Sequence, residues 1–131
     1  MKKLLINIVS TIVIIFSLLS IWEGSRVLLG ISVPDYKVFA PLLIYNVVMG
    51  FVGVVVGITI FIRHKYSIRY SSIVTLFHIS TLITISLLYF NTSSVSAHSI
   101  NAMIIRSALW LLTTISLLFS NRIFKRKNGR I

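Results

Sequence analysis

The sequence predicts an all-α fold, a bundle of four transmembrane helices. Of its 131 residues, 56% are apolar and only 11% are charged, and the mean hydropathy is +0.98. Soluble domains carry about 25% charged residues, so this composition is that of a membrane protein. Four apolar stretches also reach about the 20 residues that a helix needs to cross a hydrocarbon core of about 30 Å.

The four predicted helices cover residues of about 4–21, 39–62, 70–90 and 99–119 in a single membrane domain, 1–131. The first stretch follows Lys2 and Lys3, as in a secretory signal. Its apolar run is longer than the roughly 7 to 15 residues of a signal core, and it meets Trp22 rather than a cleavage site. We therefore expect an uncleaved helix. Cleavage near Ser20, which would leave three helices, is the alternative.

The connection 22–38 is predicted to be the one long loop, on the outer side of the membrane. Its segment 27–31 is apolar enough to lie against the membrane surface. Pro34 falls within the loop, and Pro41 suits the first turn of the second helix, where its missing N–H group is not needed.

Basic residues in short loops mark the cytoplasmic side of a membrane protein. One side of the predicted bundle carries the residues Lys2, Lys3, Arg63, Lys65, Arg69, Arg122, Lys125, Arg126, Lys127 and Arg130. The other side has Arg26 and Lys37, which are offset by Glu23 and Asp35. Both termini are therefore predicted to be cytoplasmic, in a multi-pass protein of a bacterial inner (plasma) membrane.

The formal net charge of +11 raises the question of nucleic acid. The basic clusters are short, lie between apolar runs and match no nucleic-acid motif, so we expect no nucleic-acid partner. The tail 120–131 is instead predicted to anchor topology and to bind anionic lipids. The absence of cysteine excludes disulfides and thiolate metal sites.

Three glycines lie close to one face of the second helix: Gly50, Gly53 and Gly57. Small residues at such spacing let another helix approach closely, so that van der Waals packing can hold the two together. The motif does not name its partner. Packing inside the monomer and a contact in a homo- or hetero-oligomer both remain open.

Arg106 is the most informative single residue, because a cation within the membrane normally faces protein or extends to the interface. Asn46 lies at a similar predicted depth, and Glu23 lies at the outer end of the first helix. With Tyr45 and Asn101 these residues are predicted to form a polar cluster below the outer surface. The cluster could be a buried ion pair that fixes helix order, a site for a small anion or lipid headgroup, or an arginine that only reaches the interface.

His78 is the one histidine expected deep in the membrane. A bis-histidine haem would need a second imidazole at matching depth, whereas His64 and His98 lie near the surfaces, and Met49 is a weak substitute. We interpret His78 as a hydrogen-bonded residue between helices. No cofactor and no metal site is expected.

The pattern Trp22-Glu23-Gly24, Tyr45-Asn46-Val47, Met49-Gly50, Gly57, His78, Ala102-Met103 and Arg106 spans nearly the whole chain. It resembles a group of small uncharacterised bacterial four-helix inner-membrane proteins. That resemblance implies the fold and location but no activity, since none is assigned to the group. Small multidrug transporters require a carboxylate in the first helix, and quinone-linked thiol oxidoreductases require paired cysteines. This sequence has neither.

These observations favour a structural or accessory membrane subunit that acts through helix contacts. The alternative is a small transporter, or an anion- or headgroup-binding protein, that uses the cluster around Arg106. An enzyme is not expected, because no nucleophile–base set or phosphate loop is present. A water-filled cavity that reaches Arg106 would favour the binding protein, and a dry interior would favour the subunit.

Overall fold

The computed structural model describes residues 2–35, 38–93 and 95–120 and contains no strand within them. Its four helices are α1 (Lys2–Leu28), α2 (Ala40–Phe61), α3 (Ser67–Thr92) and α4 (Ala97–Phe119). Each helix is long and apolar enough to cross a membrane. The predicted fold class, an all-α bundle of four transmembrane helices, is confirmed. Of the predicted tail 120–131, the residues from 121 onward lie outside the described part of the chain.

The first helix is longer than the sequence predicted, since α1 continues through Glu23 and Arg26 to Leu28. The predicted loop 22–38 is therefore corrected to a shorter connection, 29–39. Charged residues suggested a loop there, but they are good helix formers and lie in an unbroken helical run. As a result Glu23 and its neighbours are held on a helix.

Gly30 provides the actual end of α1. Its φ of +75° is the left-handed conformation that glycine adopts without steric cost. The N–H of Gly30 donates to the carbonyl of Val27 at 3.1 Å, and that of Ile31 donates to the carbonyl of Arg26 at 2.9 Å. This pair of bonds is a Schellman motif, which satisfies carbonyls left over at the helix end.

The other boundaries lie within about three residues of the predictions, as expected for helix ends. Ala40 precedes Pro41, so the proline occupies the first turn of α2 as predicted. The hydroxyl of Ser96 accepts a hydrogen bond from the N–H of Ser99 at 3.1 Å and caps the start of α4.

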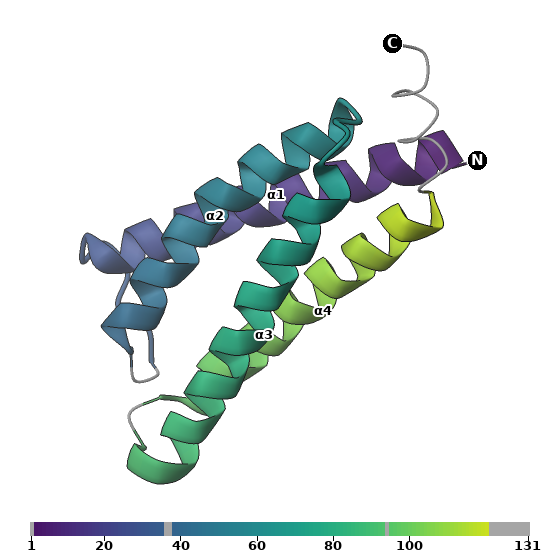
Figure 1. Ribbon diagram of the computed structural model, residues 1–131. Helices are drawn as coiled ribbons and strands as arrows, with labels where there is room; N and C mark the ends of the chain where they lie inside the picture. The colour runs from purple at the N-terminus through teal and green to yellow at the C-terminus, as the bar shows by residue number, and fades with distance from the viewer. Residues whose placement is uncertain (1, 36–37, 94, 121–131) are drawn as a thin grey trace.

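The helices pack as two antiparallel pairs, α1 with α2 and α3 with α4, and contacts between the pairs are fewer. Figure 1 shows that the pairs cross and separate toward one end. We call this the open end; it carries the connections 29–39 and 93–96. The opposite end carries the start of α1 and the connection 62–66, and we call it the basic end.

The glycines of α2 face α1 of the same chain. A Cβ atom on Gly50 would lie 2.6 Å from Cγ1 of Ile21, and one on Gly57 would lie 2.5 Å from Cγ1 of Ile14. On Gly53 it would overlap the side chain of Ser17. The close approach that the motif allows is therefore used within the monomer.

Two apolar clusters hold the helices together. The larger one lies toward the basic end and includes Ile6, Val13, Ile60, Trp110 and Leu117. The smaller one joins the first turns of α2 to α3 and α4; its buried members are Leu42, Ile85, Val95 and Met103. Between the second cluster and α1, packing is incomplete and leaves a cavity.

Candidate functional site

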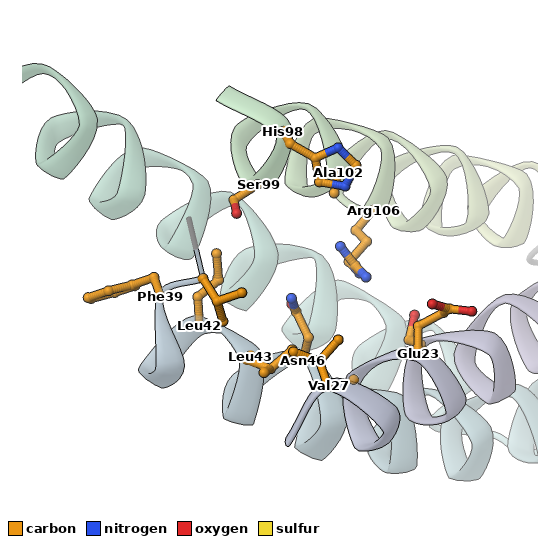
Figure 2. Close-up of a pocket in the computed structure, with 13 residues that line it drawn as sticks. Glu23, Val27, Phe39, Leu42, Leu43, Asn46, His98, Ser99, Ala102 and Arg106 are labelled. Carbon is orange, nitrogen blue, oxygen red and sulfur yellow. The ribbon is translucent and has the colours of Figure 1, made fainter. Parts of the chain in front are cut away.

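The cavity, of about 220 Å³, lies between α1, α2 and α4 toward the open end. Its polar lining residues are Ser20, Glu23, Asn46, His98, Ser99 and Arg106. Apolar side chains, among them Val27, Leu42 and Leu43, complete its walls. Figure 2 shows Arg106 and Asn46 directed into this space from two helices, with Glu23 of a third helix at its edge. A cavity with a few convergent polar groups and apolar walls is the usual form of a small-ligand site.

Helical periodicity explains why these residues meet. His98, Ala102 and Arg106 repeat every four residues and so form one face of α4. Leu42 and Asn46 have the same spacing on α2. The α1 wall runs through the extension beyond the predicted helix end, so the cavity depends on that extension.

Arg106 and Asn46 point toward each other across the space between the helix pairs (Figure 2). Both side chains are half-buried, whereas Glu23 is exposed at the rim. The Glu23 carboxylate therefore lies at the mouth of the cavity and not deep between the helices. Glu23, Asn46 and Arg106 do line the same cavity, as a polar cluster requires.

Two residues of the predicted cluster fall outside the cavity lining. Asn101 is exposed and does not line the cavity. Tyr45 also falls outside its lining and faces the interior between α2 and α3, where its hydroxyl stays within electrostatic range of Arg106. Conversely, sequence reasoning placed His98 near a surface and missed its place in the cavity wall. Its eight-residue spacing from Arg106 was the available signal.

His78 is 2% exposed and joins three helices. Its Nδ1 lies 3.3 Å from the hydroxyl oxygen of Tyr45 in a hydrogen bond. Its ring stacks on Trp110, with centroids 6.3 Å apart and planes at 27°. These contacts agree with a hydrogen-bonded residue between helices. Among the described residues, no three His, Cys, Asp or Glu side chains gather as a metal site requires.

A separate, smaller void of about 10 Å³ lies next to the main cavity, deeper between the helices. It shares Ser20, Asn46 and Arg106 with that cavity and extends to His78 and Trp110. A space of about 10 to 15 Å³ is the least that holds one water molecule. The void is thus about large enough for one water molecule.

The side-chain oxygen of Asn46 is a buried hydrogen-bond acceptor that lacks a donor in the described part of the chain. Oδ1 of Asn46 is buried and has no hydrogen-bond partner among the described residues. A buried acceptor without a donor costs about 1 to 3 kcal/mol. Asn46 lines both the cavity and the void, but Oδ1 itself has almost no accessible surface, so a donor could reach it only after the side chain rotates.

On the basic-end side of His78, the interior between α3 and α4 is filled by paired hydroxyl groups. The Thr114 hydroxyl oxygen lies 2.7 Å from that of Ser71 and 3.0 Å from that of Thr75. Thr75 also donates to the carbonyl oxygen of Trp110 at 3.0 Å. These bonds tie α3 to α4, so these hydroxyl groups are used for packing.

Comparison with known proteins finds no relative. The chain matches no protein-family model, no curated protein and no solved structure. The geometry of the cavity is therefore the basis for assigning a function.

Proposed function

We propose that this integral membrane protein binds a small ligand bearing a carboxylate or phosphate group in the cavity at the open end. The observation that carries the proposal is the Arg106 side chain directed into a 220 Å³ cavity opposite Asn46. The basic residues at the other end support a cytoplasmic location for that end. The cavity then faces outward, in a bacterial inner membrane.

The chemistry of the lining suits an anionic group. A guanidinium presents donors in a planar fork that matches carboxylate and phosphate oxygens. Ser99 and His98 add polar groups on the same helix as Arg106. In a partly dehydrated cavity such charge-assisted hydrogen bonds are stronger than neutral ones.

The remaining walls restrict what else the ligand can carry. Glu23 at the rim repels a second negative charge and attracts a cationic one. Leu42, Leu43 and Val27 offer an apolar surface. A monoanion or a zwitterion with a small apolar body fits this combination better than a polyanion.

Two other roles have less support. The glycine face of α2 is already occupied by α1, so an accessory subunit would have to bind its partner through another face. Transport would require a second opening, and the basic half of the bundle is closed by Val13, Ile60 and Leu117, which are fully buried. We therefore propose that the protein binds its ligand and that, in this conformation, it does not conduct the ligand across the membrane.

Thermal unfolding of the purified protein in detergent tests the proposal. Millimolar benzoate, inorganic phosphate, leucine and a short-chain phosphatidylglycerol serve as separate probes. At least one probe is expected to raise the unfolding temperature, because a ligand that binds the folded state stabilises it. Benzoate and leucine compare an anion with a zwitterion, and the two phosphates compare a free anion with a headgroup.

The matched variants are Arg106→Gln, Arg106→Lys and the exposed control Asn101→Ala. Arg106→Gln should weaken binding of the active probe by about tenfold to a hundredfold, the value of a charge-assisted hydrogen bond. Arg106→Lys should retain part of the affinity, and Asn101→Ala should retain all of it. The proposal fails if no probe raises the unfolding temperature of the parent protein. It also fails if the active probe raises the unfolding temperature of Arg106→Gln as much as that of the parent.

A further inference from the structure

A second cavity, of about 410 Å³, lies between α2 and α3 in the basic half of the bundle. Its walls are apolar, with valines of α2 on one side and Ile73 and Val74 of α3 on the other. Val55 and Ile73 are well exposed, so the space is a groove open to the outside of the bundle. His64 and Tyr70 lie at its end near the connection 62–66.

The groove has the length of one acyl chain in one leaflet. Val52, at its inner end, lies nine residues before Phe61 at the end of α2. That separation corresponds to about 14 Å along a helix. Half of a hydrocarbon core of about 30 Å is about 15 Å. The groove therefore extends from near the membrane centre to the interface at the basic end.

Aromatic rings connect the mouth of the groove to exposed cations. The His64 and Tyr70 rings stack with centroids 6.0 Å apart, and Tyr66 packs edge-on against Tyr70 at 6.3 Å. Nζ of Lys65 lies 4.8 Å from the Tyr66 ring centroid, and Cζ of Arg69 lies 5.7 Å from it. Lys65 and Arg69 are thus held beside the groove's polar end.

These cations have no acidic side chain of the protein nearby to neutralise them. The whole sequence contains two acidic residues, Glu23 and Asp35, and both belong to the open end. The complementary charge at the basic end must therefore come from outside the bundle. Lipid phosphates at the membrane surface supply such charge, and each nearby Lys or Arg strengthens that attraction.

We propose that this groove binds one anionic phospholipid, with an acyl chain along the α2 valines and the phosphate between Lys65 and Arg69. The site is separate from the cavity at Arg106 and would stand if that proposal failed. It also differs from a general attraction of lipid to the basic tail, because it requires both the apolar groove and the two cations.

Native mass spectrometry of the detergent-purified chain tests this site. The protein is titrated with dioleoyl phosphatidylglycerol and, separately, with dioleoyl phosphatidylcholine, which has the same chains and no net charge. We expect one phosphatidylglycerol to bind first and more tightly. The double variant K65Q/R69Q should lose about 30-fold in phosphatidylglycerol affinity and little in phosphatidylcholine affinity, since two charges are removed.

Two further variants distinguish binding in the groove from binding to the basic tail. Val55→Trp fills the groove and should weaken both lipids, whereas K125Q/K127Q removes two tail charges and should leave the first bound lipid unchanged. Circular dichroism checks that each variant remains helical. The proposal would be overturned if K125Q/K127Q lost as much phosphatidylglycerol affinity as K65Q/R69Q, or if K65Q/R69Q bound phosphatidylglycerol as tightly as the parent protein. Efficient disulfide dimerisation of Val55→Cys in a chain that has no other cysteine would also overturn it, since a second copy would then occupy the groove.

Discussion

The two halves of this bundle use the same helices and differ in how completely they are packed. Toward the basic end, Val13, Ile60 and Leu117 are fully buried, and hydroxyls such as Ser71 and Thr114 are paired. Toward the open end the helix pairs separate and leave a cavity lined by Arg106, Asn46 and Glu23. The comparison indicates that the interior of the basic half is packed for stability and leaves space in a groove on its outer side, whereas the interior of the open end is itself hollow and can accommodate a ligand.

The largest effect is expected where the packed half is tightest. Gly53→Leu places a branched side chain against Ser17 and within reach of Trp110. Overpacking at a backbone contact between helices should cost about 3 kcal/mol or more. Unfolding by sodium dodecyl sulfate titration measures this cost, with Val48→Leu on the exposed side of α2 as the control. Equal stability of the two variants would show that α1 and α2 do not rely on this contact.

An intermediate effect is expected at the boundary between the halves, where His78 meets Tyr45. His78→Phe removes the imidazole partner of the Tyr45 hydroxyl, which should cost about 1 to 2 kcal/mol. Tyr45→Phe should cost less, and the double variant should reveal a coupling energy of about 1 kcal/mol. The same unfolding titration, applied to all four proteins of the cycle, gives that coupling. A value of zero would mean that the hydrogen bond contributes nothing to stability.

The smallest effect on stability is expected inside the cavity. Ala102→Leu adds volume to an empty space, so the free energy of unfolding should change by less than about 0.5 kcal/mol. Binding of whichever probe stabilises the parent should fall by about tenfold or more, because the added side chain occupies the ligand's space. Ala108→Leu, at an exposed position of α4, is the matched control and should change neither quantity. Strong destabilisation by Ala102→Leu alone would show that the cavity is not available space.

The sequence predicted the helices well because hydrophobic length is a property of each segment by itself. It also placed Glu23, Asn46 and Arg106 together, since counting 1.5 Å per residue gives similar depths. Depth alone does not state which way a side chain faces around the helix axis. Asn101 lies five residues from Arg106, which is about 140° around the helix, and it points elsewhere.

Other features depend on contacts that no single segment encodes. The partnership of Tyr45 with His78 depends on how α2 and α3 are rotated against each other. The extension of α1 was missed because Glu23 and Arg26 lower the local hydropathy without lowering helix propensity. Gly30 could have predicted where α1 ends, because it is the first glycine after that run and a glycine can end a helix in a left-handed turn.

The extension of α1 also has a mechanical consequence. A helix of 27 residues is about 40 Å long, whereas the hydrocarbon core is about 30 Å thick. Such a helix either tilts or projects its last turns among the headgroups, and bilayer thickness sets the balance between the two. Since those last turns form one wall of the cavity, the thickness of the surrounding membrane governs how deeply the cavity mouth is immersed.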